Sequence, residues 1–157
     1  MKRLIKGLLG RFGIIDGSAS RRRLRILLLD DDAQRHRWFR GRFNADTLDI
    51  ASDVAAAKDL LSSNAYDLIF LDHDLLPEHY ECDAPDDERT GYAVAAWLAE
   101  HPHLQPSAKI MVHTRNADGA MRMVEVLRRA GRRAEYVPFP VLASRIKRGW
   151  IWKEARA

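Results

Sequence analysis

Apolar residues fall into short, almost continuous runs separated by longer segments of helical periodicity, beginning near residue 24. LRILLL (24–29) is the first such run, and AQRHRWFRGRF (33–43) spaces its apolar side chains at helical intervals. DVAAAKDLLSS (53–63) is rich in alanine and leucine and has Asp53 where a helix N-cap belongs. Short apolar runs are typical of buried strands, and periodic segments of helices, so the pattern predicts strands alternating with helices.

The alternation continues to the end of the sequence. Gly131 follows the fourth predicted helix as a C′ residue, and the polar segment 77–90, with two prolines, predicts an exposed loop. Loops of this length are uncommon in compact domains and are often functional. Further strands are expected at 48–52, 67–72, 108–113 and 134–139, and further helices at 91–101, 116–131 and 140–157.

Five apolar strands that alternate with five helices predict an α/β fold. Continuous apolar strands are buried on both faces and crossovers between parallel strands are right-handed, so the helices must cover both faces of one sheet. We therefore expect a three-layer sandwich with a five-stranded parallel sheet. Ligands of such sheets collect beyond the carboxyl ends of the strands, and the residues there are the candidates for a site.

Charge sets the N-terminal segment apart from the rest. The formal net charge is +4, but residues 1–23 carry seven cationic side chains against one acidic one, which leaves the remainder slightly negative. This argues against a nucleic acid as partner of the domain. We expect 1–23 to be a basic leader, either flexible or with an amphipathic partner-binding helix in KRLIKGLLGRFGII, and 24–157 to be one domain.

The amino-acid composition indicates the cellular compartment. Cys82 is the single cysteine, so an internal disulfide is excluded, and this fits a reducing cytoplasm. No apolar stretch is long enough for a membrane span, and 46% hydrophobic with 31% charged residues is ordinary for a soluble protein. We expect a cytoplasmic location.

Ionisable residues gather after two of the predicted strands. Asp30 and Asp31 follow the first, and Asp72, His73 and Asp74 follow the third. Carboxylates at the same edge of a sheet repel one another and lose hydration on burial, so a cation is expected beside them. That cation is either a metal ion or a basic side chain.

The sequence resembles the receiver domains of two-component response regulators over roughly residues 24–153. LRILLLDDD is similar to the first strand and acidic pair of a receiver, and DLIFLDHDLLP to the strand that carries its phospho-accepting aspartate. The resemblance implies a flavodoxin-like topology and an Mg²⁺ site formed by Asp30, Asp31, Asp72 and the backbone carbonyl of Asp74. Oxygen ligands of this kind suit Mg²⁺ or Mn²⁺.

Two departures from the receiver pattern concern the switch chemistry. His113 occupies the slot of the hydroxyl residue that ends the fourth strand, with Thr114 one residue later. Phe139, followed by Pro140, occupies the slot of the lysine that would pair with a phosphoryl group on Asp72. The lysine-dependent response of a receiver is therefore in doubt.

Four separated motifs resemble a more particular family, the cyclic-phosphate processing receiver domains. These are DDDAQRH, LDHDL, a polar insert ending in TG, and VHTRNADGA, in that order. The resemblance implies a small phosphate-containing ligand and activity on cyclic phosphates.

Imidazoles suit such chemistry because they titrate near neutrality. His113 lies in a pocket-facing slot, and with Asp72 and His73 it forms the candidate catalytic set. His73 either faces the pocket or packs beneath a helix, and His36 either reaches the pocket or lies on a solvated helix face.

The start of the fourth helix is the candidate phosphate site. Thr114, Arg115 and Asn116 precede or begin that helix, whose free backbone N–H groups attract anions, and Arg35 adds a charge from the first helix. Arg115 and Asn116 also have a simpler interpretation, as a surface charge and an N-cap.

Three functions follow from these residues. The first is a divalent-metal-dependent phosphoesterase that acts on a cyclic phosphate or cyclic nucleotide. The second is a stand-alone receiver phosphorylated on Asp72, and the third is a non-catalytic pseudo-receiver that binds a protein partner. Trp150 and Trp152 near the C-terminus are compatible with core packing or a homodimer face.

Overall fold

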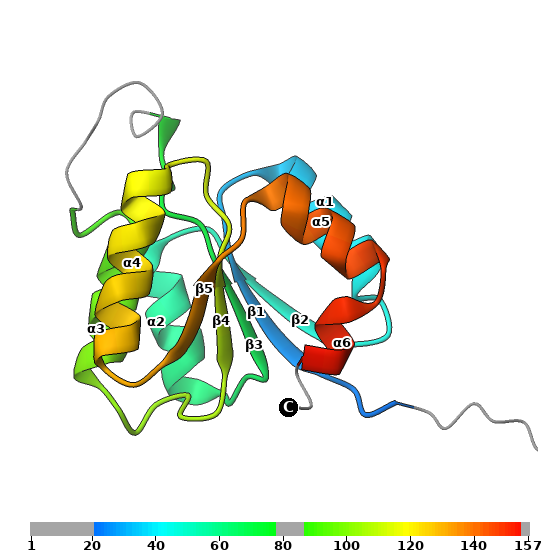
Figure 1. Cartoon of the computed structure of the whole chain (residues 1–157), viewed down its shortest axis with the longest axis horizontal. Helices are drawn as coiled ribbons and strands as arrows, with labels where there is room; N and C mark the ends of the chain where they lie inside the picture. The colour runs from blue at the N-terminus through cyan, green and yellow to red at the C-terminus, as the bar shows by residue number, and fades with distance from the viewer. Residues whose placement is uncertain (1–20, 78–86, 155–157) are drawn as a thin grey trace, which may run out of the picture.

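A central parallel sheet with helices on both faces forms the domain (Figure 1). The structure is a computed structural model and describes residues 21–77 and 87–154. The strands are β1 (Arg25–Leu29), β2 (Thr47–Ala51), β3 (Leu68–Leu71), β4 (Lys109–Val112) and β5 (Arg133–Tyr136). The helices are α1 (Ala33–Arg42), α2 (Val54–Ser63), α3 (Gly91–Glu100), α4 (Ala117–Arg129), α5 (Phe139–Lys147) and α6 (Trp150–Glu154).

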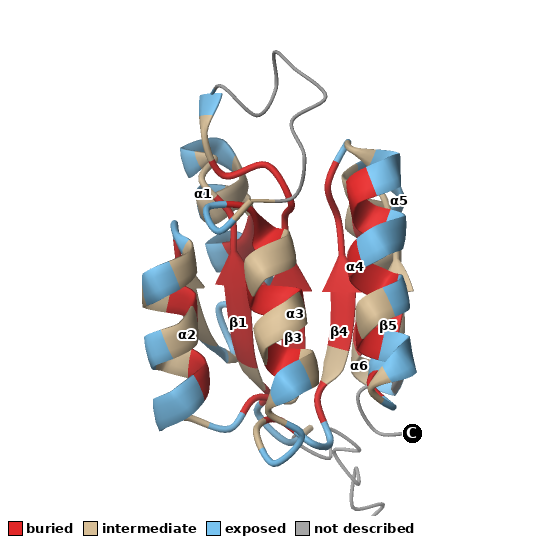
Figure 2. Cartoon of the chain, turned by 90° about the vertical axis from the view of Figure 1, so that its left-hand side faces the viewer, coloured by how far each residue is buried: buried red, intermediate tan, exposed pale blue. Residues whose placement is uncertain are grey.

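The strand order is β2-β1-β3-β4-β5, with every neighbouring pair parallel. This is the flavodoxin-like order, so the predicted three-layer sandwich with its five-stranded parallel sheet is confirmed. Helices α2, α3 and α4 cover one face, and α1, α5 and α6 cover the other (Figure 1). The central strands are buried and the helices expose only their outer faces, as Figure 2 shows.

Alternation along the strands divides the core into two parts. Leu27 and Leu29 of β1 face α2 and α3, whereas Ile26 and Leu28 face α1 and α5. All four side chains are fully buried. A strand buried on both faces must be apolar at every position, which is why β1, β3 and β4 give continuous apolar runs rather than an alternating pattern.

The C-terminal segment differs from the single helix expected over 140–157. It forms two helices, α5 and α6, because Gly149 adopts a φ of +71° between them. A left-handed residue ends an α-helix, and glycine takes that conformation without a Cβ penalty. Gly131, with φ of +77°, ends α4 in the same way, as the sequence predicts.

Helix α6 packs its tryptophans back on the domain. Trp152 donates from Nε1 to Asp46 Oδ2 at 3.2 Å, and Arg21 donates to both oxygens of the same carboxylate at 2.6 Å. Trp150 lies between two cations, with Lys109 Nζ 4.7 Å and Arg145 Cζ 4.6 Å from its ring centroid. Both rings are therefore used in packing, while a homodimer stays a prediction.

Two predicted segments fall largely outside the described residues. Residues 1–20 of the expected basic leader and residues 78–86 of the expected loop are not described. None of the helices in 21–77 and 87–154 has the length and hydrophobicity needed to cross a bilayer.

Candidate functional site

Three side chains meet at the carboxyl ends of β1, β3 and β4. The sheet hydrogen bonding continues one residue past each strand, which holds these residues in register with their neighbours. The bonds are Asp30 N to Ala51 O at 3.0 Å, Asp72 N to Leu29 O at 2.9 Å and His113 N to Leu71 O at 2.9 Å. Parallel strands end at one edge, so their following residues share a site.

Asp30, Asp72 and His113 form the group that can hold a metal ion within the described part of the chain. One ligand atom from each lies within 4.8 Å of the other two. Their exposed fractions are 0%, 3% and 2%, so the group is almost sealed from solvent. We call these three residues the strand-end group.

Arg35 supplies the cation that the sequence calls for beside the carboxylates. Its Nε and Nη2 donate to Asp30 at 2.6 and 2.9 Å, and Nη2 also donates to Asp72 Oδ2 at 2.7 Å. Arg35 lies on the first turn of α1, whose N-cap Asp32 accepts from the backbone of Gln34 and Arg35. The phosphate contact expected of Arg35 stays a prediction, and in this structure Arg35 bridges the two carboxylates.

The electrostatics of Asp30 and Asp72 differ. Burial raises the pKa of Asp30, but hydrogen bonds from His113 and Arg35 outweigh it and bring that pKa to about 2. Burial also raises the pKa of Asp72, and His113 and Arg35 only partly offset it, so its pKa stays above the ordinary value. Asp30 is thus the permanently charged member of the pair.

His113 faces the acids with one nitrogen only. Its Nε2 lies 2.9 Å from Asp30 Oδ2, and because a carboxylate only accepts, Nε2 carries the proton. Its Nδ1 has no hydrogen-bond partner among the described residues. The ring is lined by phenylalanines, with centroids at 6.0 Å for Phe39, 6.5 Å for Phe70 and 6.3 Å for Phe139.

Of the two other predicted metal ligands, the Asp31 side chain lies outside the strand-end group, and the backbone carbonyl of Asp74 stays a prediction. The Asp31 side chain is 23% exposed, with Oδ1 3.9 Å from Arg35 Nη2. The Asp74 carboxylate is buried and is within 2.7 Å of His73 Nδ1. His36 lies 2.6 Å through Nε2 from the carbonyl of Asp30, so it supports the end of β1 from α1.

His73 is buried beneath α4, one of the two alternatives left open by the sequence. A Cβ built on Gly119 of α4 would lie 2.6 Å from His73 Cδ2, so a glycine is needed where the helix crosses the ring. Nδ1 of His73 donates to Asp74, and Nδ2 of Asn116 lies 3.4 Å from the same atom. The side chain is not part of the strand-end group.

The glycine of the TG motif that ends the polar insert is required by close packing against the end of β3. A Cβ on Gly91 would come within 1.8 Å of the Asp72 carbonyl oxygen, so α3 can begin here only with glycine. Gly91 N donates to His73 O at 2.8 Å, and this fixes the start of α3 against the end of β3.

The candidate phosphate residues surround the start of α4. Thr114 is buried and its Oγ1 accepts from Asn116 N at 3.2 Å. Asn116 is the N-cap and its Oδ1 accepts from Gly119 N at 2.8 Å, which is the simpler role considered for it. Arg115 between them is exposed.

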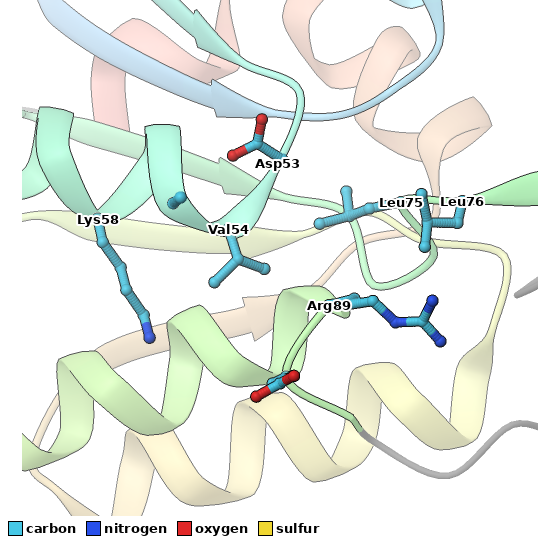
Figure 3. Close-up of a pocket in the computed structure, with 8 residues that line it drawn as sticks. Asp53, Val54, Lys58, Leu75, Leu76 and Arg89 are labelled. Atoms are coloured by element: carbon cyan, nitrogen blue, oxygen red, sulfur yellow. The ribbon is translucent and has the colours of Figure 1, made fainter.

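Two cavities open near the strand ends. One, of about 310 Å³, is lined by Asp32, Gln34, Arg35, Trp38, Arg115 and Phe139. The other, of about 540 Å³, lies between α2 and the segment after β3, with Val54, Lys58, Leu75, Leu76 and Arg89 in its wall (Figure 3).

Trp38, in the wall of the smaller cavity, is a residue that the sequence analysis did not single out. The signal was its spacing of three from Arg35, which places both side chains on one helix face.

One family model matches the sequence. The family model described as "Cyclic-phosphate processing Receiver domain" matches residues 25–129. No curated protein matches the sequence.

Solved structures similar to this fold include response-regulator receivers. A CheY-like receiver domain protein from Methanospirillum hungatei is 19% identical, with a TM-score of 0.60 over 86% of this chain and 98% of that one. A response regulator from Burkholderia pseudomallei, with a phosphorylated aspartic acid, calcium ion and citrate, is 17% identical, with a TM-score of 0.54 over 83% and 72%.

The Mn²⁺-bound form of response regulator Rcp1 is 21% identical, with a TM-score of 0.53 over 73% of this chain and 80% of that one. At these identities the likeness concerns the fold alone. The family match covers more than half of the sequence, including Asp30, Asp72 and His113. The chain therefore belongs to the cyclic-phosphate processing receiver domain family.

Proposed function

We propose that this protein is a divalent-metal-dependent phosphoesterase that opens a cyclic phosphodiester at the strand-end group. The observation that carries the proposal is the approach of two carboxylates and one imidazole, from three different strands, to within 4.8 Å in a buried site. Phe139 rather than a lysine begins α5, so the cation beside Asp72 is Arg35.

The donor set fits a divalent cation. Carboxylate oxygens suit both Mg²⁺ and Mn²⁺. Asp30 and Asp72 would hold the ion, and it would polarise the phosphate and activate water, while His113 keeps its Nε2 proton beside Asp30. Arg35 binds the same carboxylates and lines the adjoining cavity, so its guanidinium would turn from them to the phosphate oxygens.

The chain's own residues supply the proton transfers. The Asp72 carboxylate would take a proton from the attacking water as the new phosphorus–oxygen bond forms. The leaving ring oxygen would take the Nε2 proton of His113 as the old phosphorus–oxygen bond breaks. The product is a phosphomonoester, and the site recovers when one proton passes from Asp72 to His113.

His73 has a different place in the proposal. It lies beneath α4 with Asp74, beside the N-cap Asn116, and we assign it the positioning of that helix terminus. Thr114 and Arg115, in the same turn, would then lie beside the phosphate.

Purified protein should open 2′,3′-cyclic or 3′,5′-cyclic nucleotides only with Mn²⁺ or Mg²⁺ present. His113→Gln should lower kcat by about 10²-fold or more, because general acid catalysis contributes on this scale. His73→Gln should retain more of the activity. A metal-loaded protein that opens neither class of substrate would contradict the proposal.

Phosphorylation of Asp72 is a second candidate function. It is favoured by the position of Asp72 at the end of β3 with a cation on its Oδ2. Acetyl phosphate should then add a labile phosphoryl group, seen by intact mass and lost in Asp72→Asn. Absence of the adduct with metal present would exclude this function under those conditions.

A further inference from the structure

The cavity of about 310 Å³ beside Arg35 combines guanidinium groups with aromatic rings. Arg35 and Arg115 supply the charge, and Trp38 and Phe139 supply the rings. Resting on the proposed function, we propose that this cavity holds the base and sugar of a mononucleotide whose cyclic phosphate lies at the strand-end group. The substrate class is therefore nucleotide, rather than a cyclic phosphate of a simple polyol.

Arg35 connects the cavity to the acidic residues. Its guanidinium reaches both Asp30 and Asp72 at 2.6 to 2.9 Å, and the same residue forms part of the cavity wall. A ligand that fills the cavity therefore begins next to the strand-end group. Neither cavity is lined by a member of the strand-end group itself, but the smaller one is lined by Arg35 and the larger one is not.

Trp38 and Phe139 form a corner that suits a flat ring. Their centroids are 5.3 Å apart with an interplanar angle of 78°, and both side chains are half-buried. Such a pair presents one ring face and one ring edge, so a base can stack on one and meet the edge of the other. The wall of the 540 Å³ cavity contains no aromatic side chain among its described residues.

The polar groups suit a nucleotide as well. Arg115 is exposed, and its side chain makes no hydrogen bond or ion pair with another described residue, so it can turn to an anion without breaking such a contact there. Gln34 offers both a donor and an acceptor for the edge of a base. The volume of about 310 Å³ matches a single nucleoside rather than a longer nucleic acid.

The test compares two cyclic phosphates that differ in the base. Binding of adenosine 2′,3′-cyclic monophosphate and glycerol 1,2-cyclic phosphate is measured by calorimetry with Mn²⁺ present. Base stacking predicts that the nucleotide binds at least about tenfold more tightly. Trp38→Leu and Phe139→Leu should each bring that ratio close to one, whereas Trp38→Phe should largely keep it.

Lys58→Ala, in the larger cavity, is the matched control and should leave the ratio unchanged. If Trp38→Leu fails to fold, Phe139→Leu tests the same point. Quenching of tryptophan fluorescence by the nucleotide tests it too, and should be larger in the wild type than in Trp38→Phe. Equal affinity for the two ligands, no detectable nucleotide affinity, or an unchanged ratio in both leucine variants would overturn the inference.

The outcome is separable from that of the proposed function. Tryptophan-dependent nucleotide binding without turnover would keep the inference and remove the phosphoesterase. Turnover of both cyclic phosphates with equal affinity and equal kcat/KM would keep the phosphoesterase and remove the inference.

Discussion

Two buried histidines lie at the ends of neighbouring strands, each beside an aspartate, and their surroundings differ. His113 meets Asp30 at 2.9 Å on the α1 and α5 side, in a network that continues through Arg35 to Asp72. His73 meets Asp74 at 2.7 Å on the α4 side, wedged under Gly119.

The difference shows that a buried histidine–aspartate pair does not by itself define a reactive site. In the proposed function the His113 pair is the reactive one, because it shares its carboxylate with a guanidinium and faces a second carboxylate. The His73 pair is formed by adjacent residues and fits against one helix, so its geometry serves packing. Four variants or conditions test this contrast, beginning with the largest effect.

Arg35→Ala should have the largest effect, a loss of unfolding free energy from the network around His113. It leaves Asp30 and Asp72 buried without their shared cation, and breaking a buried ion pair in this way costs about 3–5 kcal/mol of unfolding free energy. Urea denaturation at pH 7 without divalent cations measures the loss. Arg129→Ala, at an exposed pair with Glu125, is the control and should change stability by less than about 1 kcal/mol. Equal effects for the two variants would contradict the network.

Gly119→Ala should disturb the His73 side. The new methyl group would meet the His73 ring at 2.6 Å, and overpacking of this kind costs about 1–3 kcal/mol. Gly41→Ala on α1, with nothing within 4 Å of its Cβ, should instead stabilise the protein by up to about 1 kcal/mol. Thermal or urea unfolding separates the two; a neutral Gly119→Ala would show that His73 is not held where the structure has it.

Lowering the pH should reduce the free energy of unfolding through Asp30, the partner of His113. Its folded-state pKa of about 2 lies below the ordinary value of 3.8, so its contribution is present above about pH 4 and is lost as pH falls toward 2. Between pH 5 and 2 the wild type should lose about 2 kcal/mol more than Asp30→Asn. The raised pKa of Asp72 makes its own contribution to stability larger at low pH, but Asp72 is present in both proteins. Parallel pH curves would contradict the assignment.

Mn²⁺ should sharpen the contrast between the two histidines. At ten times its dissociation constant a native-state ligand stabilises by about 1.4 kcal/mol, seen as a rise in Tm. His113→Phe removes the hydrogen bond that orients the Asp30 carboxylate and should reduce the Mn²⁺-dependent rise in Tm, while His73→Gln should keep it. The same loss in both variants would show that the metal does not distinguish the two sides.

The layers, the strand order and the location of the site could be predicted from the sequence. Continuous apolar runs at β1, β3 and β4 require burial on both faces, and Asp30, Asp72 and His113 follow those runs directly. The contact partners could not be predicted. Arg35 reaches two carboxylates because the first turn of α1 lies over the ends of β1 and β3.

The direction of His73 and the break after α5 depend on packing as well. Gly119 lies 46 positions after His73 along the chain, so their contact depends on how α4 crosses the sheet. In the C-terminal segment the apolar spacing continues past Gly149. Glycine can take a positive φ but need not, so the sequence alone does not predict the break there. Local pattern gives the elements, and tertiary contact decides where each side chain points.

The bond from Gly91 N to His73 O has a consequence for how this protein can diverge. It joins the residues on either side of the intervening stretch, so residues inserted or deleted there need not move the strand-end group. Lengthening a closed loop twofold costs only about 0.6 kcal/mol. Relatives can therefore change the size and chemistry of this stretch almost independently of the residues beneath it, which makes it a natural place for new specificities to arise.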